Sequence, residues 1–275
     1  MFWTRLISGI VLLLIALLAM GFGGAPLWAI LLVISLIAYR ELSKALLCST
    51  DEKNLNALEI IGFVGVIAYY GTLYLAGEPL WLLMAIVAVF LVEMFVYVFA
   101  FPKYQASQVM GAVFAFLYAP VMLAFVYMTR MAPQGVYLVW FILISSWGCD
   151  TCAYAVGKLF GRKKIFPVLS PHKSLEGCIG GMLGAALIGG LYGHFFVQQV
   201  FPEQNAALII AFICAMGALM SMVGDLAASA IKRNNKIKDY GKLIPGHGGI
   251  MDRFDSMIVT APMTYFLSIL LLEIW

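Results

Sequence analysis

Residues 79–100 read PLWLLMAIVAVFLVEMFVYVFA, an apolar run whose single charged residue is Glu93. A helix needs about 20 apolar residues to cross the hydrocarbon core of a bilayer. This run therefore predicts a membrane-spanning helix. The same criterion applied on both sides of it indicates roughly nine spans. Their approximate limits are 5–22, 26–46, 57–76, 79–100, 109–128, 136–157, 179–200, 206–230 and 255–274.

The composition of the whole chain agrees with this pattern. Of its 275 residues, 63% are hydrophobic and 11% are charged, whereas a soluble domain carries about 25% charged residues. An ordinary soluble globular protein is therefore excluded, and we predict an all-α polytopic membrane helix bundle. The first span is expected to stay uncleaved, because the next apolar run follows within a few residues. Five cysteines without paired spacing argue against a disulfide scaffold.

The positions of Lys and Arg predict the orientation of the spans. If the N-terminus is cytoplasmic, all 17 of these residues except Arg130 fall on the cytoplasmic side, where such residues are enriched. We therefore expect an integral protein, of the plasma membrane if its source is bacterial, with two basic loops, 158–178 and 231–254, facing the cytoplasm. We assign residues 1–130 to a scaffold that could admit lipid or contact a second copy, and residues 131–275 to a catalytic region.

Three carboxylates lie within the predicted spans of the N-terminal half. Glu41 follows Arg40 at the end of a span, which favours an ion pair at the helix end. Glu59 is expected at a helix interface. Glu93 lies mid-span, where an ionisable side chain is by default a functional hypothesis. It has no neighbouring glycine or base, and an interhelical hydrogen bond is the interpretation favoured here.

Two polar stripes distinguish the C-terminal half. In each, residues four apart share one helix face, which must contact protein or a wet cavity rather than lipid. For Asp150, a buried hydrogen bond and a role in a site are equally favoured. For Asp225 a functional role is favoured, because its helix leads directly into the second basic loop. The stripes are Ser146, Asp150 and Tyr154, and Ser221, Asp225 and Ser229.

The second basic loop and its flanks hold the largest group of charged residues and glycines suited to a binding site. Residues 229–255 read SAIKRNNKIKDYGKLIPGHGGIMDRFD. Glycines allow close backbone approach, and successive N–H groups form a concave anion site. Lys and Arg supply charge for phosphate. Asp252 and Asp255 are three apart and share a helix face, so they could hold a hard cation. Together these features indicate a nucleotide or phosphate site.

This stretch resembles the signature of the phosphatidate cytidylyltransferases, also called CDP-diacylglycerol synthases. That signature is Ser-x-x-Lys-Arg, four residues, Lys-Asp-x-Gly, and then Pro-Gly-His-Gly-Gly-x-x-Asp-Arg-x-Asp, and every fixed position is filled from Ser229 to Asp255. Residues 170–177, SPHKSLEG, resemble a second motif of the family, with His172 where another basic residue is common. Ser174 can also cap the next helix, whose N-terminus would attract phosphate.

The resemblance implies transfer of the cytidylyl group of CTP to phosphatidate, giving CDP-diacylglycerol and pyrophosphate. The phosphate of the lipid is already ionised, so the reaction needs charge neutralisation and in-line positioning more than a strong base. We assign Asp225 and Asp252 as the leading Mg²⁺ ligands, with Asp255 and Asp150 as further or outer ligands and room for a second cation. The candidate catalytic residues are Asp225, Asp252, Lys173, Arg253 and His247. The candidate substrate-binding residues are Ser170, Lys173, Ser174, Glu176, Ser229, Lys232, Arg233, Lys238, Asp239, Gly246, Gly248 and Gly249.

The expected partners are CTP, phosphatidate and the lipid bilayer, without nucleic acid, and the resemblance implies a homodimer. Two alternatives remain open. A CTP-dependent polyprenol or phytol kinase would share the membrane setting, but the complete signature argues against it. An ion-coupled transporter would use intramembrane carboxylates such as Asp150, Asp225 and Glu93, but the paired repeats typical of transporters are not evident.

Overall fold

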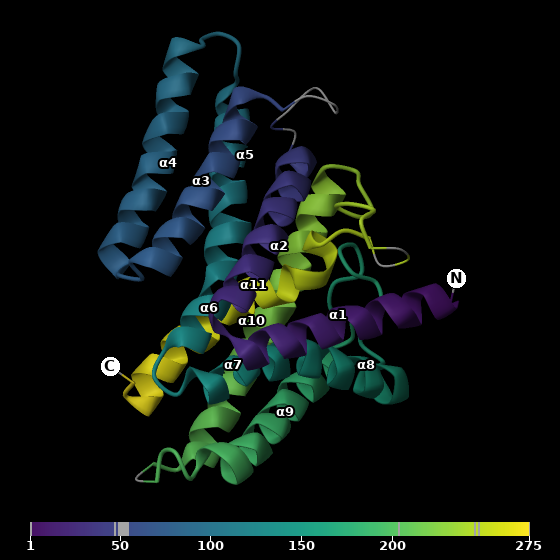
Figure 1. Ribbon diagram of the computed structural model, residues 1–275. Helices are drawn as coiled ribbons and strands as arrows, with labels where there is room; N and C mark the ends of the chain where they lie inside the picture. Colours follow the sequence, from purple (N-terminus) through teal and green to yellow (C-terminus); the bar gives the residue numbers. More distant parts are fainter. Residues whose placement is uncertain are drawn as a thin grey trace. The chain divides into compact units, whose positions relative to one another are not determined.

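The computed structural model describes residues 2–46, 48, 55–202, 204–244, 246 and 248–274, with side chains from residue 7 onward. Every regular element in these ranges is helical (Figure 1). Three helices continue through a π-helical turn: α5 into α6 through Leu117–Val121, α7 into α8 through Ile144–Gly148, and α9 through Gly193–Val197. The helices are α1 (Phe2–Phe22), α2 (Gly24–Ala45), α3 (Ala57–Leu75), α4 (Pro79–Phe99), α5 (Ala106–Phe116), α6 (Met122–Met131), α7 (Gly135–Leu143), α8 (Cys149–Phe160), α9 (Leu175–Tyr192), α10 (Ala206–Asn234) and α11 (Met251–Leu272).

The predicted spans are confirmed. Within the described residues, eight helical segments are long and apolar enough to cross a membrane, and Ile7–Phe22 is a shorter apolar helix. The chain is therefore an integral membrane protein built as a helix bundle. Two boundaries differ from the expected ones in a way that matters for the site. The span predicted at 179 begins at Leu175, and the span predicted at 255 begins at Met251. Asp252 and Asp255 consequently lie in the first turns of α11.

Two compact units make up the chain. The first contains the residues up to Ala124 and Asn234–Arg253, and the second contains Phe125–Arg233 and the residues from Phe254 onward. The loop that carries most of the signature thus belongs to the same unit as the N-terminal helices. The predicted division near residue 130 concerns the roles of scaffold and catalytic region, and it stays a prediction.

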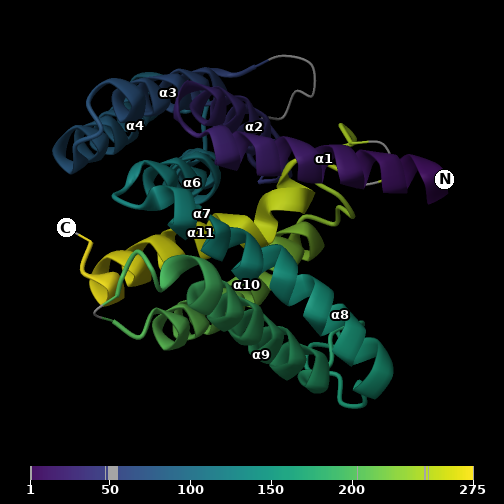
Figure 2. The ribbon, with the colours of Figure 1, turned by 60° about the horizontal axis from the view of Figure 1, so that its bottom comes forward.

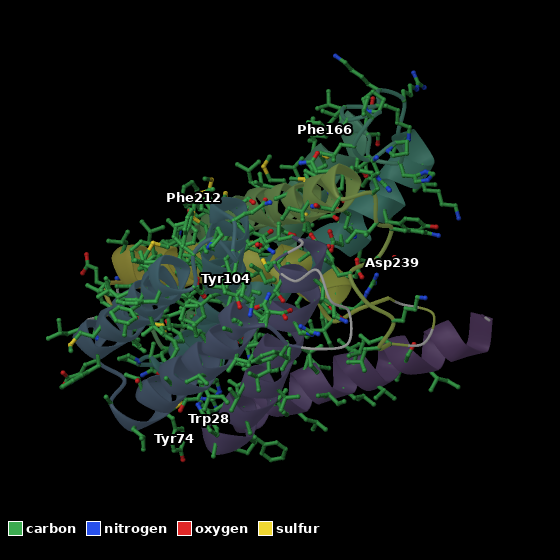
Figure 3. The ribbon with its side chains drawn as sticks, turned by 90° about the horizontal axis from the view of Figure 1, so that it is seen from above. Trp28, Tyr74, Tyr104, Phe166, Phe212 and Asp239 are labelled. Carbon is green, nitrogen blue, oxygen red and sulfur yellow. The ribbon has the colours of Figure 1, made fainter. Side chains whose placement is uncertain are left out.

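In the first unit, α3 packs between α2 and α4, and α5 contacts all three of these helices (Figure 1). The indole N–H of Trp28 donates to the carbonyl oxygen of Tyr70 at 2.8 Å, and the rings of Trp28 and Tyr74 lie 5.0 Å apart (Figure 3). The hydroxyl groups of Ser35 and Tyr70 are 2.6 Å apart inside the bundle. These contacts satisfy buried polar groups on helices that otherwise pack through apolar side chains.

The acidic residues of the first unit correct one expectation from the sequence. Arg40 pairs with Glu59 of α3, not with the adjacent Glu41. Glu59 is fully buried at this α2–α3 contact, which confirms the predicted interface position. Its carboxylate also closes a capping box with Asn56 at the start of α3. Glu93 is fully buried, but neither carboxylate oxygen has a hydrogen-bond partner among the described residues, so the expected interhelical hydrogen bond is not formed there.

In the second unit, α8 and α9 lie against each other along their lengths (Figure 2). Glycines of α9 make this close approach possible. A Cβ at Gly181 would lie 2.9 Å from the Cβ of Ala153, and one at Gly184 would lie 2.6 Å from the Cβ of Cys152. These glycines and the Cys149–Cys152 segment therefore serve helix packing. A separate apolar core joins α7, α10 and the end of α11 around Phe141, Ile210 and Leu272.

Candidate active site

An ion pair between Lys173 and Asp225 lies at the centre of the polar region in the second unit. Lys173 Nζ is 2.5 Å from Asp225 Oδ2. Lys173 precedes α9, and Asp225 lies on α10, one turn before Ser229. A residue of the 170–177 motif is therefore brought into direct contact with the polar stripe predicted at Ser221, Asp225 and Ser229. An ammonium group held this close to a carboxylate fixes both side chains in position.

A cavity of about 370 Å³ opens beside this pair. Its walls come from the polar face of α8, the loop before α9, the first turn of α9, and α10. Lys173 and Lys158 supply positive charge, and Asp150 and Tyr154 come from the stripe predicted on α8. The other lining residues are Ala153, Gly157, His172, Ser174, Gly177, Cys178 and Met222. The cavity thus combines an apolar wall with cationic groups, which suits an amphiphilic phosphate.

The loop before α9 is held by the first turn of that helix. Ser174 Oγ accepts a hydrogen bond from the N–H of Gly177 at 3.2 Å, which confirms Ser174 as the N-cap. The carboxylate of Glu176 accepts from the N–H groups of Arg162 and Lys163 at 3.0 and 3.2 Å. Lys164 Nζ donates to the carbonyl oxygen of His172 at 3.1 Å. These bonds tie the basic loop to the first turn of α9 beside Lys173.

The second unit also gathers acidic groups. The charges of Asp225, Asp150 and Lys232 all act on the carboxyl group of Asp255. Asp225 and Asp150 therefore lie within electrostatic range of Asp255, and the ammonium groups of Lys232 and Lys173 are counter-charges to Asp255 and Asp225 respectively. These carboxyl groups present oxygen donors, the ligand type that Mg²⁺ prefers. Among the described residues no three such side chains are already arranged at ligand distances.

The signature loop in the first unit has a different bonding pattern. Asp252 is 7% exposed, and its Oδ2 accepts from the N–H groups of Tyr240 and Gly249 at 2.9 and 3.0 Å. The N–H of Ile244 donates to the carbonyl oxygen of Gly248 at 2.9 Å, which closes a tight turn. Gly248 has a φ of 85°, a conformation that residues with a Cβ rarely adopt. The glycines of this segment therefore shape the turn.

Glu41 is a residue of this loop region that sequence reasoning did not connect with the signature. Its carboxylate oxygens accept from the N–H groups of Ile250 and Met251 at 3.1 and 2.8 Å. Glu41 lies in the last two turns of α2, more than 200 positions earlier in the chain. No local pattern signals such a contact. The sequence shows only that the N–H groups at the start of the helix after the signature need an acceptor from outside the helix. It does not show which residue supplies that acceptor.

The remaining predicted residues fall into three groups. Ser170 and Ser229 are half-buried in the second unit. Several candidates are exposed, namely Arg233, Lys238, Asp239 (Figure 3), Gly246 and Arg253. His247 lies outside the described residues, as does Pro245. Because Asp252 and Asp225 belong to different compact units, their proposed sharing of one cation stays a prediction, as do the substrate contacts of all these residues.

Comparison with known proteins identifies the family. A model of the cytidylyltransferase family matches residues 3–271. The chain belongs to the cytidylyltransferase family. Three curated relatives are each named phosphatidate cytidylyltransferase. That of Staphylococcus saprophyticus is 28% identical over 98% of this chain and 99% of its own length. That of Bacillus subtilis is 36% identical over 52% of this chain and 51% of its own, and that of Haemophilus influenzae is 38% identical over 48% and 46%. Cytidylyltransferases generally use a divalent cation.

Proposed function

We propose that this protein transfers the cytidylyl group of CTP to phosphatidate, giving CDP-diacylglycerol and pyrophosphate for phospholipid biosynthesis. The observation that carries this proposal is similarity along nearly the whole chain to proteins named phosphatidate cytidylyltransferase. The cavity beside Lys173 and Asp225 supports it, because a charged site on membrane-spanning helices suits a phosphate attached to acyl chains. Neither a lipid kinase nor a transporter gains support from any feature of the fold.

The chemistry needs little from the protein beyond charge and position. A phosphate oxygen of phosphatidate attacks the α-phosphorus of CTP and forms a new P–O bond. The bond from the α-phosphorus to the bridging oxygen breaks, and pyrophosphate leaves with the electron pair. In this proposal Lys173 neutralises a phosphate group at the cavity wall, in addition to its contact with Asp225, and Arg253 binds phosphate through its forked guanidinium. Holding the reacting groups in line supplies much of the rate enhancement.

The acidic groups fit a hard divalent cation. Asp225, Asp255 and Asp150 are the residues of the second unit that would hold Mg²⁺, and Asp252 is the proposed ligand from the signature loop. Mg²⁺ bound there would neutralise the triphosphate and the leaving pyrophosphate. Lys173 has a separate role, because its ammonium group already contacts Asp225 and orients that carboxylate. A second cation would be accommodated by the same oxygen donors.

The membrane setting is part of the proposal. Phosphatidate keeps its acyl chains in the bilayer and its phosphate at the interface, whereas CTP arrives from water. We place the site at the cytoplasmic face, of the plasma membrane in a bacterium, because all Lys and Arg residues except Arg130 fall on one side of the predicted topology. The homodimer implied by the family resemblance is retained as a prediction.

Transfer of radiolabel tests the function directly. Purified protein in vesicles that contain phosphatidate is supplied with Mg²⁺ and CTP labelled at either the α- or the γ-phosphorus. Cytidylyl transfer moves the α-label into lipid and leaves the γ-label in pyrophosphate. Movement of the γ-label into a polyprenol or phytol would instead identify a kinase. The proposal would be overturned if neither α-labelled nor γ-labelled CTP gave labelled lipid.

A further inference from the structure

The signature loop is bonded to a carboxylate from the opposite end of the chain. Glu41 is 8% exposed and accepts hydrogen bonds from the N–H groups of Ile250 and Met251. These donors lie at the start of α11, where N–H groups have no partner within the helix. A carboxylate there satisfies them and also interacts favourably with the helix dipole. The two residues that follow Met251 are Asp252 and Arg253, both proposed site residues.

Two glycines of the signature make room for this carboxylate. A Cβ built on Gly241 would overlap Oε1 of Glu41, and a Cβ on Gly249 would overlap both carboxylate oxygens. Neither glycine adopts a positive φ, so backbone conformation does not explain the absence of a side chain at these positions. Both are fixed positions of the signature. Their small size is explained by the buried carboxylate of Glu41.

The ion pair expected between Glu41 and its neighbour Arg40 is not formed. Arg40 contacts Glu59 of α3. Within the part of the chain that the structure describes, the hydrogen bonds of the Glu41 carboxylate come from main-chain N–H groups of the signature loop. The N–H groups of Tyr240 and Gly249 bind Asp252 in the same region. Two buried carboxylates thus fix one short segment of main chain.

We propose that Glu41 is a positioning residue for the signature loop. It holds residues 248–251 so that Asp252 and Arg253 are presented in the orientation that CTP requires. It acts through main-chain N–H groups and not by touching a substrate. The catalytic part of this inference rests on the proposed function, whereas the effect on loop structure does not.

The structural part is tested by amide hydrogen exchange in lipid nanodiscs. In Glu41→Gln, the amide offers one acceptor oxygen and its NH₂ group would face an N–H donor. Exchange at Ile250 and Met251 is expected to become about tenfold faster or more, because bonds to a charged acceptor are lost. The control is Glu59→Gln, which breaks the ion pair with Arg40 and lowers thermal stability without contacting the loop.

Two results would overturn the structural claim. One is unchanged exchange at residues 250 and 251 in Glu41→Gln. The other is the same acceleration in Glu59→Gln, which would mean that general loosening of the first unit opens the loop. If the wild-type protein transfers no cytidylyl group, the proposed function fails, but the exchange result still decides the role of Glu41 in the loop.

The catalytic part is tested by separating KM from kcat. A loss of folded protein lowers the apparent kcat and leaves KM unchanged. A misplaced loop should instead raise the KM for CTP by about tenfold in Glu41→Gln, with the KM for phosphatidate unchanged, since the lipid is assigned to the cavity of the second unit. An unchanged KM for CTP would contradict the positioning role.

A double-variant cycle provides a second readout. In Gly241→Ala the new methyl group collides with Glu41, and kcat/KM for CTP should fall. In Glu41→Ala the same loss arises from removal of the carboxylate. The double variant Glu41→Ala with Gly241→Ala should be no worse than Glu41→Ala alone, because the collision is gone. Fully additive losses would show that Gly241 is required for another reason, and would contradict the inference.

Discussion

Two buried carboxylates of the first unit, those of Glu41 and Asp252, have a different kind of partner from the carboxylate of Asp225 in the second unit. In the first unit, Glu41 and Asp252 are less than 10% exposed and bind main-chain N–H groups. In the second, the side chain of Asp225 is 33% exposed, contacts the ammonium group of Lys173, and lies next to the cavity that Lys173 lines. A carboxylate that accepts main-chain hydrogen bonds holds a loop in place, whereas one that is paired with a side-chain ammonium group beside a cavity can exchange that partner for a substrate or a cation. On this comparison we predict a shaping role for Glu41 and a reacting role for Asp225. Asp252 accepts main-chain hydrogen bonds and is also a proposed Mg²⁺ ligand, so it tests the division.

The largest expected effect is that of Asp225→Asn. Asparagine keeps the shape of the side chain but removes its charge, so Lys173 and any bound cation lose their partner. We expect cytidylyl transfer to fall by at least about 10²-fold, equivalent to roughly 2.7 kcal/mol of transition-state stabilisation. Turnover is measured against Mg²⁺ concentration in protein that inserts and purifies normally. Wild-type turnover in this variant would remove Asp225 from the site.

Asp252→Asn tests whether Asp252 binds a cation or only shapes the signature loop. If Asp252 shares a cation with Asp225, this variant should also lose about 10²-fold in turnover, and the double variant should be scarcely worse than either single one. The amide oxygen can still accept from Tyr240 and Gly249, so exchange in the loop should change little. If turnover persists while exchange at Tyr240 and Gly249 rises, Asp252 belongs entirely to the shaping group.

A smaller loss is expected for Arg253→Lys. Arg253 is exposed and next to the buried Asp252. Lysine keeps the charge but not the forked donor geometry of the guanidinium. Turnover should fall by about tenfold with unchanged thermal stability. Near-native turnover would show that Arg253 does not bind phosphate through paired donors.

The sequence predicted those parts of the fold that depend on local patterns. Apolar runs of about 20 residues located the spans, because each helix satisfies its own main chain within the bilayer. The N-cap at Ser174 could also be predicted, because a capping side chain bonds to an N–H group only three residues away. The 170–177 motif and the polar stripe that contains Asp225 were recognised separately in the sequence, and the contact between Lys173 and Asp225 joins them.

The contacts of Glu41 could not be predicted in this way. Its partners are N–H groups of Ile250 and Met251, and main-chain donors are common to every residue except proline. The predicted span begins at residue 255, four residues after the observed start of α11 at Met251. This difference also depends on a distant residue. The N–H groups at the start of the helix are satisfied by Glu41, which lies more than 200 positions away in the sequence. Arg40 was paired with its neighbour because sequence proximity gave no sign of Glu59 on the next helix.

The most direct test of this comparison is transfer of α-labelled CTP into lipid, measured across a range of Mg²⁺ concentrations for wild type, Asp225→Asn and Glu41→Gln. We expect wild type to form labelled CDP-diacylglycerol and Asp225→Asn to lose at least about 10²-fold at every Mg²⁺ concentration. Glu41→Gln should transfer more slowly at limiting CTP and approach the wild-type rate at saturating CTP. The account is contradicted if Asp225→Asn retains wild-type transfer and Mg²⁺ dependence, or if Glu41→Gln transfers at the wild-type rate at limiting CTP.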